Sequence, residues 1–265
     1  MNSKVIQRSW FLAGLIMWAA PAQAFVGSDD FTIGGPGSNW DPNFTTSGAG
    51  LLQQNGDGVV RYSSSGAGDE DRVWGWQVGL APLATNWSMQ LDVTVPNAIS
   101  LGGSFRAVGI GLVVLNDADA NDTMGSVMEE VSFGDPTEFH NFFSSQEING
   151  VTQPELSASA PSDSGAVRIQ WDAGSSILAA QYDADGATGG YNWTTLRSFN
   201  PTLGGTWNMG GSDSFRLALL SYSESVAVSN SDGVMADNFQ VVPEPASWMA
   251  MVGGAALLAG MRRRR

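Results

Sequence analysis

Four oxygen-bearing side chains lie close together near the middle of the chain and could bind a metal ion. They are Asp117, Asp119, Asn121 and Asp122. Oxygen ligands at alternating positions allow a tight loop to wrap around Ca²⁺, and the segment begins like an EF-hand loop. It then departs from that motif, because Asp122 stands where glycine is needed and Met128 where the bidentate glutamate belongs. We therefore predict an irregular calcium site, with a solvated loop as the alternative.

Two adjacent carboxylates, Glu129 and Glu130, are the obvious candidates for acid and base chemistry on sugars. Glycoside hydrolysis usually requires two carboxyl groups on the same side of a cleft. Neighbouring residues of a strand point to opposite faces, so these two cannot share a cleft unless a bulge intervenes. A hydrolase would need one of them and a distant partner, and the alternative is a solvated charge on a sheet face.

Tryptophan rings could stack on the apolar faces of sugar rings. Seven of the ten tryptophans lie between residues 25 and 241, and we expect Trp87 and Trp171 to be buried because they fall on alternating apolar faces. The candidates for sugar stacking are Trp40, Trp74, Trp76 and Trp207. Packing in the core is the alternative for each of them.

Several kinds of chemistry are excluded by composition. The chain has no cysteine, so it has no thiol nucleophile, no cysteine metal ligand and no disulfide, and its single histidine, His140, excludes sites built from several imidazoles. No Gly-x-Ser-x-Gly motif accompanies His140, so we expect a surface or packed histidine. Asp183 and Asp185 precede Gly186 and are better explained by a turn than by a metal site.

The elements that must position these residues are strands. Between residues 87 and 95 the sequence alternates strictly, which places Trp87, Met89, Leu91, Val93 and Val95 on one face. Residues 105–115 are apolar on both faces, as in a covered central strand. The remaining candidate strands are residues 59–62, 73–80, 127–133, 166–171, 177–182, 193–199, 215–222 and 234–241. About ten strands joined by turns predict an all-β fold, a two-sheet antiparallel β-sandwich.

Residues 166–199 read as three strands joined by turns at 172–174 and 183–186. A strand, an Asp-Gly turn, a second strand ending in Tyr182-Asp183 and a third strand bearing Trp193 resemble the middle of concanavalin-like jelly rolls, the family of legume lectins and laminarinases. The opening Asp29-Asp30-Phe31 and the closing strand also fit a sandwich whose termini pair. The Glu-x-Asp-x-x-Glu signature of the laminarinase-like enzymes is missing, so the resemblance implies a fold rather than an activity.

The two ends of the chain differ from this body. Lys4 and Arg8 precede an apolar core at residues 10–20, and Ala22-Gln23-Ala24 has the small-x-small form that signal peptidase accepts. We therefore predict a signal peptide over residues 1–24, with a retained N-terminal anchor as the alternative. Residues 25–241, the predicted sandwich domain, carry six basic against 25 acidic side chains, a net charge of −19. Such a surface repels nucleic acid and anionic lipid and favours divalent cations or neutral polymers.

The C-terminal residues 242–265 combine three features in order. Pro243, Glu244 and Pro245 precede an apolar run at 246–261, which would span only about 24 Å as a helix, and the chain ends with Arg262, Arg263, Arg264 and Arg265. This tail resembles the PEP-CTERM sorting signal of Gram-negative envelope proteins. The resemblance implies recognition by an exosortase-type enzyme near Pro243, Glu244 and Pro245, with the short helix as a transient inner-membrane anchor. A permanent single-span protein is the alternative.

Together these features predict an exported protein of the cell surface or extracellular matrix. By family implication its setting is exopolysaccharide or biofilm, and its role is that of a nonenzymatic binding or structural module. The first alternative is a carbohydrate-active hydrolase or lyase of the concanavalin-like class, and the second is a coat protein without a ligand. Expected partners are signal peptidase, the exosortase-type enzyme and extracellular polysaccharide, with no nucleic acid, and Ca²⁺ is the candidate cofactor.

Overall fold

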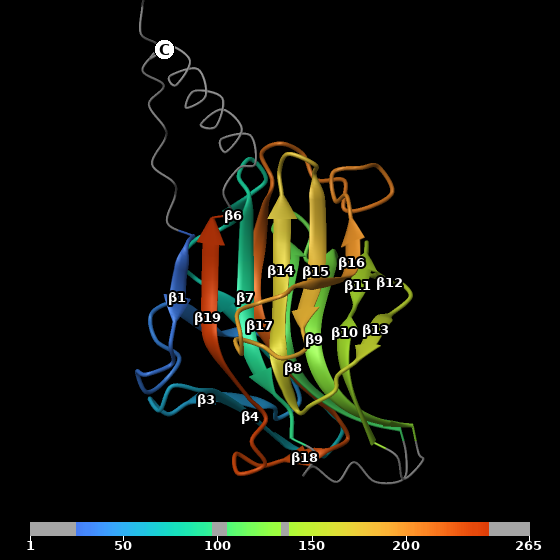
Figure 1. Cartoon of the computed structure of the whole chain (residues 1–265). Coiled ribbons are helices and arrows are strands. Elements are labelled where there is room, and N and C mark those ends of the chain that lie inside the picture. Colours follow the sequence, from blue (N-terminus) through green and yellow to red (C-terminus); the bar gives the residue numbers. More distant parts are fainter. Residues whose placement is uncertain (1–24, 97–104, 134–137, 244–265) are drawn as a thin grey trace, which may run out of the picture.

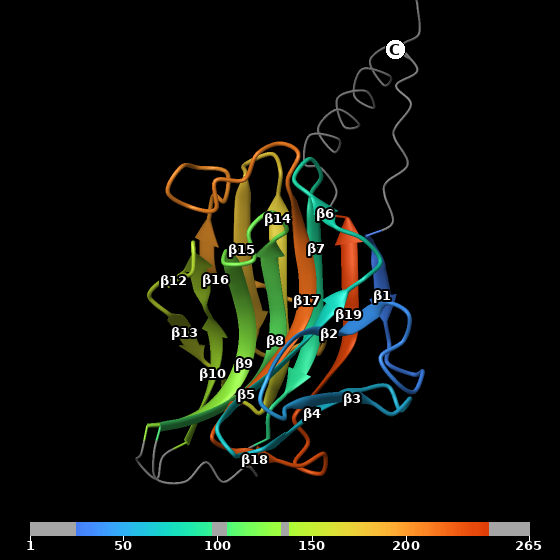
Figure 2. The same ribbon diagram turned by 180° about the vertical axis from the view of Figure 1, so that it is seen from behind.

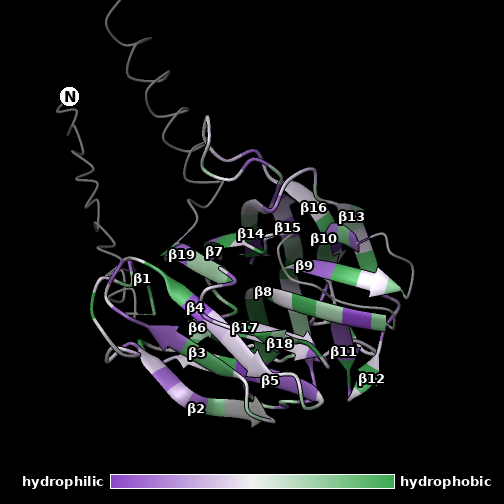
Figure 3. Ribbon diagram, turned by 90° about the horizontal axis from the view of Figure 1, so that it is seen from below, coloured by the Kyte–Doolittle hydropathy of each residue, from purple (hydrophilic) through white to green (hydrophobic). Residues whose placement is uncertain are grey.

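The protein is a sandwich of two antiparallel β-sheets in a computed structural model that describes residues 25–96, 105–133 and 138–243. Figure 1 shows the first sheet in front, and Figure 2 shows the second. Viewed from one end in Figure 3, β7, β14 and β15 lie above β8 and β9. No helix occurs within the described ranges, and therefore none there is long and apolar enough to cross a membrane. The all-β prediction is confirmed, whereas the predicted C-terminal helix lies outside these ranges.

The first sheet is built around the long strands that face the core with alternate residues. Its order is β16 (Thr194–Phe199), β15 (Ile177–Asp183), β14 (Ser164–Asp172), β7 (Trp87–Thr94), β19 (Met235–Pro243), β4 (Val60–Ser65) and β18 (Ala227–Val228). Two more strands pair at its side, β1 (Gly27–Asp29) with β19 and β3 (Leu51–Gln54) with β4. The pairing of β1 with β19 confirms that the two ends of the sandwich domain are neighbours.

The second sheet carries the longest strands. Its order is β12 (Val151–Thr152), β11 (Gln146–Ile148), β9 (Thr123–Phe133), β8 (Phe105–Asn116), β17 (Ser214–Glu224), β5 (Asp69–Trp76) and β2 (Trp40–Ser47). Three further strands join it, β10 (Glu138–Ser144) beside β9, β13 (Leu156–Ser159) beside β10, and β6 (Ala81–Pro82) beside β17. All ten predicted strands are present, with shifted ends.

The core lies between the two sheets and follows the alternation of the sequence. The odd-numbered residues of β7 point into it, and Trp87 and Trp171 are fully buried, as predicted. The outer side of β7 is less exposed to solvent than expected, because Ser88 and Gln90 are also buried. The hairpin of β14 and β15 turns at Asp172, whose Oδ1 accepts the N–H of Gly174 at 2.9 Å. This confirms the Asx turn expected there.

Candidate functional site

A row of residues crosses four adjacent strands on the outer face of the second sheet. Glu129 of β9 pairs with Asn141 of β10 on one side and with Gly109 of β8 on the other. Gly109 in turn pairs with Tyr222 of β17. A Cβ at Gly109 would lie 2.7 Å from Cε1 of Tyr222, so only glycine lets the tyrosine ring lie across β8. The Tyr222 hydroxyl thereby reaches over the strand and donates a hydrogen bond to Oε2 of Glu129.

Around this pair the surface is hollowed into a pocket of about 280 Å³, which we call the glutamate pocket. Two further carboxylates, Glu155 and Glu224, line it. Phe105 and Phe133 stand at its edge as a cross-strand pair with ring centroids 5.5 Å apart. These rings are 53% and 68% exposed, so the pocket combines ionisable groups with accessible aromatic surface.

Burial sets the electrostatics of the pocket. It raises the pKa of Glu129 from 4.5 to about 7, with smaller contributions from Glu155 and Glu224, while the bond from Tyr222 acts in the opposite direction. Burial and the nearby Glu129 raise the pKa of Tyr222 well above its usual value. Glu224 also has a raised pKa, caused by burial and by repulsion from Asp69 and Glu155. The pKa of Glu129 therefore lies near neutral pH, where a carboxyl group can either donate or accept a proton.

The two adjacent glutamates point to opposite faces, as the strand pattern predicted. Glu129 lines the pocket, whereas Glu130 points into the sandwich and has no exposed surface. Burial raises the pKa of Glu130 to about 8, and Glu138 adds repulsion. The alternative of a solvated charge is wrong for both residues. Glu155 and Glu224, which are distant from Glu129 in the sequence, line the same pocket.

The four tryptophans proposed for sugar stacking are placed in the core instead. Trp40, Trp74, Trp76 and Trp207 are between 2% and 6% exposed. Trp40 and Trp76 pack at 5.0 Å, and their indole N–H groups donate to Asp29 Oδ2 at 2.7 Å and to the Phe25 carbonyl at 2.9 Å. Trp74 and Trp76 do share a face, but that face is the buried one. The stacking role is thereby corrected for Trp40, Trp74 and Trp207, because their rings present too little surface to a ligand. Trp76 is also buried, at 6% exposed, but it lines a pocket beside β17.

The acidic loop between β8 and β9 is held by bonds within the protein. Asp117 pairs with Arg216, and Oδ1 of Asp119 accepts the backbone N–H of Asn121 at 3.0 Å. Asp122 is buried, and its Oδ1 accepts the N–H of Asn149 at 2.7 Å. In the part of the chain that the structure describes, no three histidine or carboxylate side chains are grouped to hold a metal. Calcium binding by Asp117, Asp119, Asn121 and Asp122 stays a prediction.

The other singled-out residues have local roles. His140 is half-buried and bonds through Nε2 to the Val95 carbonyl at 2.7 Å, so it is a packed histidine. Asp183 accepts the N–H of Asp185 at 3.2 Å in the expected turn. Pro243 is the last residue of β19 and is exposed. Outside the described residues lie the predicted signal peptide with Ala22 and Ala24, and Glu244, Pro245, Arg262, Arg263, Arg264 and Arg265.

Sequence reasoning missed Tyr222, Glu224 and the two phenylalanines of the pocket. Tyr222 and Glu129 are 93 positions apart in the chain, and only the register of three strands brings them together. The available signal was Gly109 within an otherwise apolar strand, because glycine in a strand marks a place where another group approaches closely.

No protein-family model matches the chain, and no curated protein matches its sequence. Solved structures match its fold. An endo-1,3-beta-glucanase from Streptomyces sioyaensis aligns with a TM-score of 0.53 and 14% identity, over 84% of this chain and 97% of that one. Xyloglucan PUL GH43B from Bacteroides ovatus aligns with a TM-score of 0.52 and 13% identity over 82% of this chain, which spans 39% of that protein. The carbohydrate recognition domain of Emp46p aligns with a TM-score of 0.45 and 10% identity, over 77% and 88%.

The two-sheet architecture and the first two of these structures define the class of fold. The chain is an antiparallel two-sheet β-sandwich whose fold is similar to that of these two proteins. At identities of 13% and 14% the likeness describes the fold alone. Its function must therefore be argued from the site.

Proposed function

We propose that the protein is an exported carbohydrate-binding module whose ligand occupies the glutamate pocket. The observation that carries this proposal is the meeting of Glu129 and Tyr222 with the exposed rings of Phe105 and Phe133. Sugars present hydroxyl groups at their edges and C–H surfaces on their faces, so they need polar groups and aromatic rings together. Two proteins that share the fold are named for a glucan and for xyloglucan, which agrees with this ligand class.

A neutral glycan suits the pocket better than a charged one. Glu129, Glu155 and Glu224 line it, and Asp69 lies close enough to Glu224 to repel it. An anionic polymer would meet this repulsion in addition to the net negative charge of the whole domain. A neutral polysaccharide, by contrast, can use the carboxylates as acceptors for its hydroxyl groups.

Glycoside hydrolysis is the second candidate, and the pKa of Glu129 favours it. A carboxyl group with a pKa of about 7 is suited to protonate a leaving group at neutral pH. Glu155 or Glu224 would then act as the second carboxylate. A ligand-free coat protein remains the third candidate.

The setting of this function follows from the two ends of the sequence. The predicted signal peptide takes the chain across the inner membrane, and the tail that begins at Pro243 would be recognised by an exosortase-type enzyme. The mature protein then stands at the cell surface or in the extracellular matrix, where polysaccharide is abundant. Mass spectrometry of mature protein from its native host tests this proposal, and an intact arginine tail would contradict processing.

Glycan-array binding measured in parallel with release of reducing sugar separates the three candidates. We expect binding to neutral glycans without release, and loss of binding of about tenfold or more in Phe133→Ala and Glu129→Gln, the size of effect that one buried contact supplies. Leu203→Ala removes a comparably exposed apolar side chain, 57% exposed, from a distant loop and serves as the control. Turnover that Glu129→Gln abolishes would establish the hydrolase. If neither glycan binding nor turnover is detected, the coat protein is favoured.

A further inference from the structure

The hydrogen-bonding ladder of the second sheet has a gap beside β17. One side of β17 pairs with β8 along its length, whereas the other side pairs first with β6 and then with β5. The pairing with β6 ends at Phe215, opposite Ala81, and the pairing with β5 begins at Ala218, opposite Gly75. Between these pairs the chain leaves the sheet as a loop over residues 77–80, so Arg216 and Leu217 have no strand partner there. Because successive residues of a strand direct their N–H and C=O groups to opposite sides, one of these two residues aims both groups into the gap.

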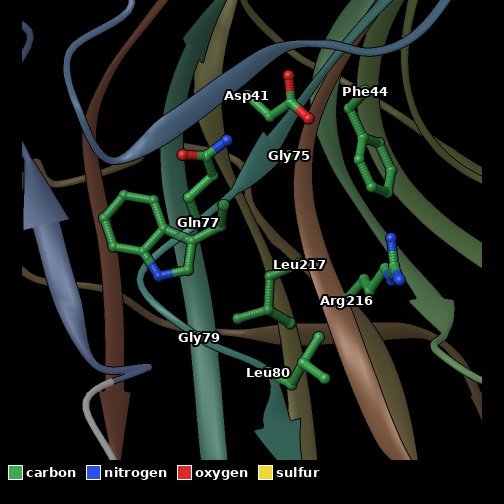
Figure 4. A pocket seen from close by; sticks show the side chains of 9 residues that line it. Asp41, Phe44, Gly75, Gln77, Gly79, Leu80, Arg216 and Leu217 are labelled. Carbon is green, nitrogen blue, oxygen red and sulfur yellow. The ribbon is translucent and has the colours of Figure 1, made fainter.

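The gap opens into a pocket of about 310 Å³, which we call the gap pocket. Figure 4 shows Asp41 and Gln77 on one side of it, Phe44 and Arg216 on the other, and Leu80 and Leu217 at its base. Its volume lies at the lower end of the range for small-molecule sites, which is about 300 to 1,000 Å³. The gap pocket therefore has room for a small ligand or for one unit of a polymer.

The polar groups of the gap pocket are fixed by contacts that leave them able to bind. Oδ1 of Asp41 accepts the N–H of Asn43 at 3.0 Å, which orients the carboxylate and occupies one of its several acceptor positions. The Nε of Arg216 donates to Asp117, and the guanidinium lies 5.8 Å from the centre of the Phe44 ring. A guanidinium has five N–H donors in a planar fork, so the bond to Asp117 leaves donors for a ligand.

The bulge in β2 brings the aromatic wall into place. The register between β2 and β5 shifts between Asp41 and Thr45, and the Phe44 ring comes to lie over Gly75. A Cβ at Gly75 would be 2.7 Å from Cδ2 of Phe44, so the ring occupies the space that a side chain would fill. The gap pocket thus combines a carboxylate, an amide and a guanidinium with apolar side chains and two aromatic rings, those of Phe44 and Trp76.

We propose that the gap pocket binds one unit of a neutral glycan, as a second site on the same face as the glutamate pocket. The choice of a glycan rests on the proposed function. Asp41 accepts hydroxyl protons, Arg216 donates to hydroxyl oxygens, and Leu80 and Phe44 contact the C–H surface of the sugar. Arg216 is already paired with Asp117, so Asp41 leaves the gap pocket with a net negative charge. This charge selects a neutral unit over a uronate, and the net charge of the domain acts in the same sense.

The two pockets are spaced so that one polymer could occupy both. Arg216 and Tyr222 lie on the same face of β17, and six residues of strand span about 20 Å. Once a long chain is bound at one site, its binding at the other becomes intramolecular, which strengthens overall binding without a new contact. The protein would therefore hold a polysaccharide along its length rather than recognise a chain end.

Chemical-shift mapping tests the gap pocket separately from the glutamate pocket. The probes are glucose, galactose, mannose and xylose, with glucuronate as the charged comparison, added to the whole ¹⁵N-labelled chain in a detergent that lacks a sugar headgroup. We expect at least one neutral sugar to shift the amide signals of Gln77, Leu80 and Arg216, and glucuronate to shift them less. Arg216→Gln and Asp41→Asn should each weaken this response about tenfold.

The matched control is Arg61→Gln, which breaks a surface ion pair with Asp57 at 2.7 Å on the other sheet and should leave the response unchanged. If signals around Glu129 and Tyr222 shift while those of the gap pocket do not, the proposed function stands and the second site is refuted. If only the gap pocket responds, the second site stands and the glutamate pocket is refuted as the ligand site. Equal responses in Arg216→Gln and the unmodified chain would also overturn the assignment.

Discussion

Replacing Glu130 by glutamine should make the protein more stable at alkaline pH. The Glu130 carboxyl lies in the core without exposed surface, and its pKa rises from 4.5 to about 8 because burial and the neighbouring Glu138 disfavour its charged form. Glutamine has nearly the same shape and carries no charge at any pH. The substitution therefore removes an ionisation that the folded protein resists, while it preserves the packing.

The sign and size of the effect follow from proton linkage. Between pH 4.5 and about 8 the folded state binds a proton at Glu130 that the unfolded state has released, so the free energy of unfolding falls as the pH rises through this interval. The full loss corresponds to about 5 kcal/mol and is reached above pH 8. Since domains are stable by only about 5 to 15 kcal/mol, this one carboxyl is a large fraction of the total.

Urea unfolding at pH 5, 7 and 9 measures this loss. The unmodified protein should lose several kcal/mol from pH 5 to pH 9, on the order of the linkage value for Glu130 together with a smaller one for Glu129. Glu130→Gln should flatten this dependence, whereas Asp163→Asn, which changes an exposed carboxylate, should not. Parallel curves for Glu130→Gln and the unmodified protein would refute the reasoning.

Three further substitutions test other parts of the structure. Gly109→Ala places a Cβ 2.7 Å from Tyr222, so it should cost about 1 to 3 kcal/mol of unfolding free energy and, by NMR titration, raise the pKa of Glu129 as the Tyr222 bond is lost. Arg197 of β16 in the first sheet donates a buried bond to Gln146 Oε1 of β11 in the second sheet at 3.0 Å. Arg197→Met removes this bond and should lower the thermal midpoint by several degrees, and an unchanged midpoint would show that the contact between the sheets adds no stability. Trp40→Phe removes the indole bond to Asp29 and should lower the free energy of unfolding in urea by about 1 to 3 kcal/mol while glycan binding stays unchanged. Weakened binding would show that Trp40 contacts the ligand after all.

The parts of the fold that the sequence could predict are those whose local pattern agrees with their environment. Strict alternation predicted β7 correctly, because one face of that strand lies in the core. The Asx turns predicted the ends of β14 and β15, because each turn has its own hydrogen-bonding side chain. Strand β2 was missed because Pro42 and Asn43 interrupt it, and only the structure shows that they form a bulge opposite β5. Short edge strands such as β12 and β13 have too few residues for a period to show.

The candidate site was less predictable, because its contacts depend on register rather than on neighbours in the chain. The alternation rule correctly separated Glu129 from Glu130, but it could not name Tyr222 as the partner of Glu129. The same limit explains the tryptophans. A period of two tells that Trp74 and Trp76 share a face, yet it does not tell which face the opposite sheet covers.

Residues that depart from the locally most stable choice gather on the outer face of the second sheet, which favours a ligand site there. Gly109 and Gly75 are glycines within strands and leave space that the rings of Tyr222 and Phe44 fill, and Glu129 is buried at a cost in its charged form. These features lie on one face, whereas the outer face of the first sheet carries the expected polar residues of β7. Sequences depart from locally stable choices mainly at functional sites. The same departures form the two pockets, which is the pattern expected if the face was shaped by binding rather than by folding.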